Sequence, residues 1–144
     1  MTGPAFLDTN VLVYLFDTGA PAKQRRAQEI LEGETRDGRV LLSTQVLQEF
    51  YVAVTRKLAK PLDGESAERA VHDLAALPTV QVDTPMVLSA VARSRRQRLS
   101  FWDALIVESA VAGRAGRLLT EDLQHGRVID GVRIENPFLK KPSN

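Results

Sequence analysis

The sequence lacks cysteine altogether, which excludes disulfide bonds and thiolate metal ligands from its 144 residues. This absence is consistent with a reducing compartment, and we expect a cytoplasmic location. No apolar run approaches the roughly 20 residues that a membrane-spanning helix needs, and the N-terminus lacks the charged and apolar regions of a secretory signal. Repeats and low-complexity segments are also missing. We therefore predict a single domain over residues 1–144, with no membrane association and with a loosely ordered tail over residues 136–144.

An excess of charge of one sign is missing as well, because 19 basic residues nearly balance 18 acidic ones. The balance conceals local clusters, and clusters matter more than net charge for binding an anionic polymer. The densest cluster is a group of arginines: Arg93, Arg95, Arg96 and Arg98. We regard these four side chains as candidate contacts for a nucleic-acid backbone.

Short apolar runs alternate along the chain with segments whose apolar residues recur at helical spacing. The runs predict strands that end at residue 8 and cover residues 40–42, 80–82 and 117–120. The spacing predicts helices at 9–15, 21–32, 43–57, between 64 and 78, from 83 into the arginine cluster, and at 100–112. This alternation indicates an α/β fold in layers, with a largely parallel central sheet. Asp130 and Gly131, between two apolar runs, additionally predict a β-hairpin.

Two helices carry more specific expectations. Thr9 or Asn10 can cap the first helix, because both side chains accept hydrogen bonds from free amides at a helix N-terminus. In the helix that starts near residue 83, the apolar spacing predicts that three residues face the core: Val87, Leu88 and Val91.

Most acidic residues fall on polar helix faces, in caps or in turns, but Asp103 does not. On a helical wheel it lies between Ile106, Val107 and Ala110, and no Lys or Arg is placed three or four residues away. Burial of an unpaired carboxylate is very costly. The alternative is that Asp103 only interacts with the N-terminal helix dipole.

Three further carboxylates stand out in the same way. Glu49 lies at the edge of an apolar helix face without a nearby cation, and Asp8 and Asp122 each follow a short apolar strand. The ordinary alternatives are a surface glutamate and two turn residues. Glu121 competes with Asp122, which we prefer because Thr120 and Asp122 alternate to the same side of an extended chain.

Together these four acids indicate a metal site. Clustered carboxylates raise one another's pKa unless a cation joins them, and hard oxygen ligands suit Mg²⁺ or Mn²⁺. Such ions activate water and stabilise charge on a phosphate. Combined with the arginines, the pattern predicts a metal-dependent phosphodiesterase.

The same residues resemble the PIN-domain ribonucleases, in particular the VapC-type toxins of bacterial toxin–antitoxin modules. The resemblance rests on four segments in the family's order and spacing, which are residues 6–10, 48–50, 102–106 and 119–122. It extends over nearly the whole chain. It implies a three-layer α/β/α fold with about five strands, a pocket that binds Mg²⁺ or Mn²⁺, and endoribonuclease activity.

Carried over by position, the resemblance implies roles for individual residues. Asp8 and Asp103 would bind the metal directly, Asp122 would bind it directly or through water, and Glu49 would bind it or orient the attacking water. Residues that match the polar side chains bracing this pocket are Thr9, Asn10 and Thr120. The family further implies an antitoxin that covers the groove, and a homodimer. The RNA is left open, with transfer RNA and ribosomal RNA both possible.

Three other functions fit the sequence less well than a metal-dependent ribonuclease. A haloacid-dehalogenase-like phosphatase needs a second aspartate where this chain has Asn10. A metal-free ribonuclease would need His72 and His125 together, and both look like surface residues. A catalytically weak RNA- or protein-binding module of the same fold would have no need of four unpaired acids.

Overall fold

The computed structural model of the protein describes residues 3–139. Its centre is a six-stranded sheet with the order β3-β2-β1-β4-β6-β5, in which all neighbours are parallel except β5 and β6. The strands are β1 (Ala5–Leu7), β2 (Val40–Ser43), β3 (Thr79–Val80), β4 (Arg117–Leu119), β5 (Val128–Ile129) and β6 (Val132–Glu135). The helices are α1 (Thr9–Tyr14), α2 (Pro21–Arg36), α3 (Thr44–Arg56), α4 (Gly64–Ala75), α5 (Thr84–Gln97) and α6 (Phe101–Ala112).

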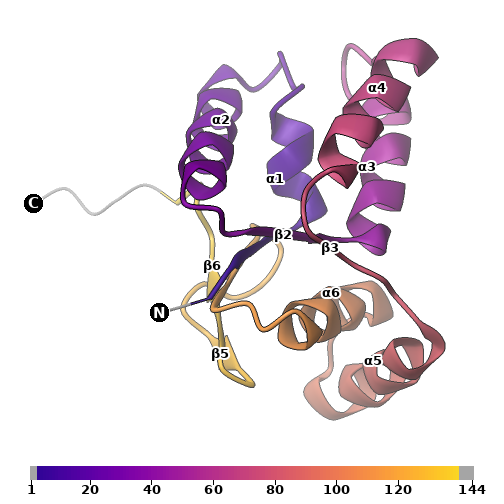
Figure 1. Cartoon of the computed structure of the whole chain (residues 1–144), viewed down its shortest axis with the longest axis vertical. Coiled ribbons are helices and arrows are strands. Elements are labelled where there is room, and N and C mark those ends of the chain that lie inside the picture. The colour runs from indigo at the N-terminus through magenta and orange to yellow at the C-terminus, as the bar shows by residue number, and fades with distance from the viewer. Residues whose placement is uncertain (1–2, 140–144) are drawn as a thin grey trace, which may run out of the picture.

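Helices cover both faces of the sheet, with α1 to α4 above it and α5 and α6 below it in Figure 1. The central strand β1 is completely buried, as is most of β2 and β4, because helices pack on both sides of them. Strands buried in this way have continuous apolar sequences. The prediction of a layered α/β fold with a mainly parallel sheet is confirmed.

The order of the strands reverses beside β1. The chain moves from β1 to β2 and β3 on one side, and β4 then pairs with β1 on the other side. In open parallel sheets, ligands bind in the crevice outside the carboxyl ends of the strands at such a reversal. Asp8 follows β1 and the segment 120–122 follows β4, so both candidate segments lie at this crevice.

The hairpin predicted at Asp130 and Gly131 is present. Both residues have positive φ, 47° and 83°, as a two-residue turn between twisted strands requires. The turn joins β5 to β6, and β6 in turn pairs with β4. The sheet therefore has six strands, and the expected number of about five was low by one short edge strand.

The first two helices differ from their predicted ends. Asp8 itself caps α1, with its side chain accepting a hydrogen bond from the Thr9 amide, so neither Thr9 nor Asn10 is the cap. Helix α2 continues past Gly33 to Arg36, because Glu34 is held by Arg117 of β4. The helix is therefore four residues longer than the predicted range of 21–32, since a tertiary contact outweighs the low helix propensity of Gly33.

Helix α5 is rotated relative to the prediction. Val87, Leu88 and Val91 are exposed, and the residues that α5 buries are Ala90 and Arg93. The buried face of this helix therefore carries a charge.

Arg93 is 3% exposed, and its guanidinium forms salt bridges with Glu108 of α6 and with Asp130 of the hairpin, each at 2.7 Å. It also donates to Gln97. These bonds hold α5 against α6, and the two carboxylates neutralise the charge of the Arg93 guanidinium. Arg93 is therefore removed from the exposed arginine cluster in which the sequence placed it.

The end of the described chain is also held in place. The Pro137 carbonyl accepts a hydrogen bond from Arg26 Nε, and Phe138 packs edge-on against Tyr14 with ring centroids 4.9 Å apart. Residues 137 and 138 thus contact α2 and α1, and residues 140–144 lie outside the described part, so the loosely ordered tail over residues 136–144 stays a prediction. Within residues 3–139, no helix is both long and apolar enough to cross a bilayer.

Candidate acidic active site

Asp8 is the most buried carboxylate of the candidate site, with 4% of its surface exposed. Its amide bonds to the Leu119 carbonyl of β4, which fixes it at the strand end. Oδ1 accepts from the Thr9 amide at 2.7 Å, and Oδ2 accepts from the Thr120 hydroxyl at 2.8 Å. The side chain is therefore held in one orientation by groups from two neighbouring strand ends.

Thr120 connects Asp8 to Asp122. Its hydroxyl is fully buried, donates to Asp8 Oδ2, and accepts from the Asp122 amide at 3.1 Å. Asn10 adds a second connection, since its Nδ2 donates to Asp122 Oδ2 at 3.0 Å and to the Thr120 hydroxyl at 3.3 Å. The turn after β4 is thus braced against the start of α1, and the Asp122 carboxylate is exposed at its end.

Glu49 reaches the same place from α3. Its Oε1 accepts from the Thr9 hydroxyl at 3.1 Å and from Gln45 Nε2 at 3.3 Å. Ser43 starts this helix directly after β2, with its hydroxyl accepting from the Val46 amide, as predicted. The short connection from β2 to α3 places Glu49 one and a half turns into the helix.

Asp103 comes from the first turn of α6, on the other side of the sheet. Ser100 caps this helix by accepting from the Asp103 amide at 3.1 Å. In the described part of the chain, no salt bridge reaches the half-buried Asp103 carboxylate. A hydrogen bond with the Ser100 side chain lowers the pKa of Asp103 but does not offset the effect of burial. The helix dipole also favours the charged form.

The pKa values of three of these acids are raised, chiefly by burial. Burial raises the pKa of Asp8 to about 7, against the Thr120 and Thr9 hydrogen bonds, and the charges of Asp122 and Glu49 raise it further. Burial also raises the pKa of Glu49, with Asp103 adding to the rise, and the pKa of Asp103, with Asp122 adding to it. Each carboxylate therefore repels two others, and we call the four the acidic ring: Asp8, Glu49, Asp103 and Asp122.

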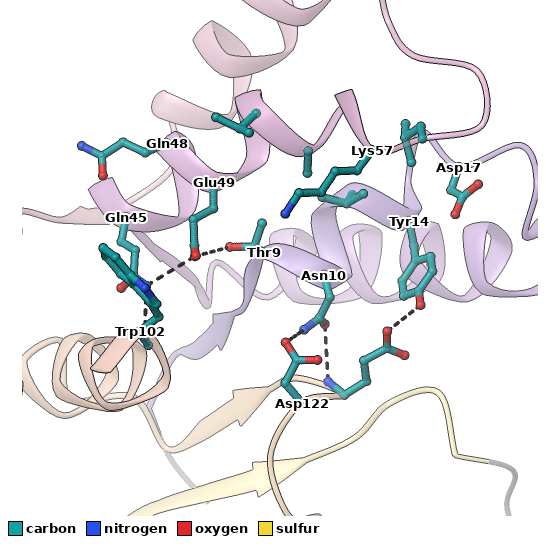
Figure 2. A pocket seen from close by; sticks show the side chains of 15 residues that line it. Thr9, Asn10, Tyr14, Asp17, Gln45, Gln48, Glu49, Lys57, Trp102 and Asp122 are labelled. Carbon is teal, nitrogen blue, oxygen red and sulfur yellow. Dashed lines mark hydrogen bonds between the residues drawn. The ribbon is translucent and has the colours of Figure 1, made fainter. Parts of the chain in front are cut away.

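Two members of the acidic ring, Glu49 and Asp122, line a groove of about 760 Å³ between α1, α3, α6 and the turn after β4, and Asp8 and Asp103 adjoin its lining residues Thr9 and Trp102 in the chain. We call it the acidic groove. Figure 2 shows Glu49 and Thr9 on one side of it and Asp122 and Asn10 facing them. The lining also includes Lys57 and Trp102, for which the sequence suggested no role.

Glu121 is engaged elsewhere. Its carboxylate accepts from the Tyr14 hydroxyl and forms a salt bridge with Lys23 at 3.0 Å. Asp122, in contrast, is the carboxylate whose charge raises the pKa of Asp8 and of Asp103. The choice of Asp122 over Glu121 stays a prediction. The alternation used to make it does not apply, because β4 ends at Leu119 and a turn follows.

The other candidates lie away from the acidic groove. Arg95, Arg96 and Arg98 are exposed on or just after α5, and none of them lines the groove. His72 and His125 border different cavities, and His125 Nδ1 accepts from the Asn136 amide. The structure does not bring the two histidines together, so a ribonuclease that uses a histidine pair does not fit.

The donor atoms of the acidic ring suit Mg²⁺ or Mn²⁺, because these ions prefer carboxylate oxygen ligands. In residues 3–139, no member of the ring takes part in a salt bridge. The carboxylates are not drawn to a common point, however, since no three acidic or histidine side chains of the described residues lie close enough to hold an ion. The chemistry of the ring therefore fits a divalent ion, around which its side chains would have to close.

The raised pKa of Asp8 predicts that the metal-free protein loses stability as pH rises. Between about pH 4 and 7 the folded state holds a proton on Asp8 that the unfolded chain releases, so the free energy of unfolding falls through this window and levels off above it. The fall should be on the order of a few kcal/mol. Denaturant unfolding in a chelator at pH 5 and pH 8 measures it. Asp8→Asn should flatten the dependence in part, and an unchanged slope would contradict the account.

Comparison with known proteins agrees with this fold. The family model of the PIN domain matches residues 5–130. No curated protein sequence gives a significant match. The matched segment covers most of the 144 residues. The chain belongs to the PIN-domain family.

Solved structures with the same fold include several toxin–antitoxin proteins. A toxin–antitoxin complex from Klebsiella pneumoniae is 22% identical, with a TM-score of 0.69 over 93% of this chain and 98% of that one. VapBC from Salmonella typhimurium, bound to DNA, is 21% identical, with a TM-score of 0.64 over 94% and 99%. VapC20 from Mycobacterium tuberculosis, described as a sarcin-ricin loop cleaving toxin, is 19% identical, with a TM-score of 0.58 over 79% and 86%. At these identities the likeness concerns the fold.

Proposed function

We propose that the protein is an endoribonuclease that depends on Mg²⁺ or Mn²⁺, and that the acidic ring is its active centre. The observation that carries the proposal is the mutual repulsion of four carboxylates from four separate segments, with three raised pKa values and, within the described residues, without a salt bridge. Membership of the PIN-domain family supports it. A structural role would favour paired acids, because unpaired buried charge destabilises a fold.

Each residue of the ring then has a role that follows from its surroundings. Asp8 and Asp103 would hold the ion, since burial desolvates both and neither takes part in a salt bridge within the described residues. Asp122 would hold it directly or through water. When bound, the ion supplies stabilisation of charge on the phosphate and activation of water. Glu49, whose pKa is raised by burial, would bind the ion or orient and deprotonate the attacking water.

The polar neighbours would keep these acids in position. Thr9 bonds to both Asp8 and Glu49, and Thr120 bonds to both Asp8 and Asp122. Such partners of metal ligands orient them and tune their affinity. Asn10 would do the same for Asp122.

The test of the function is a cleavage assay with purified protein, the metal ion and cellular RNA, followed by mapping of the new ends. Discrete internal cuts are the expected result, and the map would also identify the RNA, for which transfer RNA and ribosomal RNA are both candidates. RNA that binds to the folded, metal-supplied protein without being cut would favour the binding-module alternative instead.

We also propose that the protein is the toxin of a toxin–antitoxin pair and acts in the cytoplasm as a homodimer. The structural neighbours described as toxin–antitoxin complexes support the pairing. The exposed apolar residues Val87, Leu88 and Val91 of α5 are available for a contact between copies. Analytical ultracentrifugation of the chain, alone and with the product of an adjacent small reading frame, should give a dimer and a larger complex. A chain that stays monomeric and does not bind the second protein would contradict both proposals.

Arg95, Arg96 and Arg98 remain proposed contacts for the RNA backbone outside the acidic groove, because they are exposed and close in sequence. Replacement of Arg95 and Arg96 by alanine should weaken RNA binding and reduce its dependence on salt concentration by about two phosphate contacts. Binding measured at several salt concentrations gives this slope, and an unchanged slope would place the RNA elsewhere.

A further inference from the structure

The side chain of Trp102 is 61% exposed, which is unusual for the largest apolar side chain. It occupies the first turn of α6, directly before Asp103, and lines the acidic groove together with Glu49 and Asp122. Its exposure therefore falls where the proposed reaction takes place.

The backbone of Trp102 is fixed relative to the acidic ring, and its indole packs against a neighbouring ring. The Trp102 carbonyl accepts from Gln45 Nε2 at 3.1 Å, and the same amide donates to Glu49 Oε1 at 3.3 Å. Gln45 is only 3% exposed. On its other side the indole packs edge-on against Phe101, with ring centroids 5.1 Å apart. Figure 2 shows Trp102, Gln45 and Glu49 grouped at one end of the groove.

The surroundings of Trp102 suit a nucleobase better than an apolar protein surface. The groove residues that lie nearest to it along α3 are polar, Gln45, Gln48 and Glu49, so the indole faces amides and a carboxylate at this end of the groove. The apolar lining residues Val52, Ala53 and Leu58 come later in the chain. Every nucleobase has a flat face that stacks on an aromatic ring and edges that bond to polar groups. Stacking also attracts RNA without using positive charge, of which the groove lining holds only Lys57 within the described residues.

We propose that Trp102 is the stacking residue for an unpaired nucleobase next to the phosphate that is cut. This inference rests on the proposed ribonuclease function and adds a substrate class to it. Both faces of a base inside a duplex are covered by its neighbours, so the nucleotide on Trp102 is single-stranded or turned out of a helix. The protein therefore selects RNA that is unpaired at the cleavage site.

The kinetic test compares Trp102→Leu and Trp102→Phe with the unchanged protein on short single-stranded RNA. Leucine keeps the apolar volume without an aromatic face, and it should lower kcat/KM roughly tenfold, mainly through KM. Trp102→Phe, which keeps an aromatic face, should retain most of the kcat/KM of the unchanged protein. Val128→Ser, which changes an exposed apolar residue of β5 outside the groove, should have no effect.

RNA with a single abasic nucleotide at successive positions locates the stacked base. One position beside the cut should cost the unchanged protein about as much as Trp102→Leu does, and the same RNA should cost Trp102→Leu nothing further. If Trp102→Leu cuts normally, or if the abasic penalty persists in it, the stacking role is wrong while the ribonuclease function stands.

Fluorescence gives a readout that does not depend on cleavage, because Trp102 is the only tryptophan in the sequence. With Asp8→Asn protein and Mg²⁺, RNA should quench the indole emission, and abasic RNA should quench it less. If the protein cut no RNA but showed this quenching, the stacking would survive the failure of the proposed function. Emission that responds to a protein partner and not to RNA would assign Trp102 to a protein interface and overturn the inference.

Discussion

Asp8→Asn should reduce RNA cleavage by more than about 100-fold, because loss of outer partners of metal ligands alone costs 10- to 100-fold. The carboxylate is buried and repelled by Asp122 and Glu49, so its charge is kept only at a cost in stability. The asparagine side chain can still cap α1 and accept from the Thr9 amide. The fold should therefore survive while the charge is lost, and circular dichroism with initial cleavage rates measures both.

Asp103→Asn should have an effect of the same size, and within the described residues it removes a charge without breaking a salt bridge. The matched control is Asp17→Asn. Asp17 lines the same groove, but its carboxylate accepts from the Gly19 amide and lies outside the acidic ring. Full activity of either ring variant, or equal loss in the Asp17 control, would show that the site is assigned wrongly.

Removal of divalent ions should stop cleavage completely. The acidic ring repels a phosphate on its own, and no cation of the described chain neutralises it apart from the attraction of Lys57 for Glu49. Treatment with a chelator followed by Mg²⁺ or Mn²⁺ should first abolish and then restore cleavage. The measurement is the initial rate on one defined RNA across the cycle, with circular dichroism to verify that the chelated protein stays folded.

Two outcomes would contradict this expectation. Cleavage that continues in the chelator would exclude the metal mechanism. Restoration of Asp8→Asn by the added ion to the full rate would show that the ion acts somewhere other than the acidic ring.

The parts of the site that were predictable from sequence are those that local physics determines. An apolar run that ends in Asp8 places an acid at a strand end, and the Asp103 carboxylate has no cation at helical spacing. Ser43, Asp83 and Ser100 cap their helices as the sequence indicates. These features depend on neighbours within four residues, where the chain itself fixes the geometry.

The errors come from contacts between segments that are distant in sequence. The apolar spacing of α5 correctly predicts a helix but not its rotation, which is set by the bonds of Arg93 to Glu108 and Asp130, 15 and 37 residues away. A buried arginine cannot be distinguished from an exposed one by periodicity. For the same reason, nothing local indicates that Lys23 and Tyr14 engage Glu121.

The roles of Gln45 and Trp102 were missed for a related reason. Gln45 lies four residues before Glu49, a spacing that brings two side chains of a helix together, so its bond to Glu49 had a visible signal. Its second bond, to the Trp102 carbonyl, spans 57 residues and had none. The exposure of Trp102 is not expected for a large apolar side chain, and it becomes visible only once α6 is placed against the sheet.

Direct binding of Mn²⁺ tests most closely whether the acidic ring is a metal centre. Calorimetric titration of the unchanged protein, Asp8→Asn and Asp17→Asn compares the affinities without reference to activity. The account predicts binding by the unchanged protein and the Asp17 variant, and binding that is at least about 10-fold weaker in Asp8→Asn. Equal affinity of all three proteins, or no binding by any of them, would contradict it.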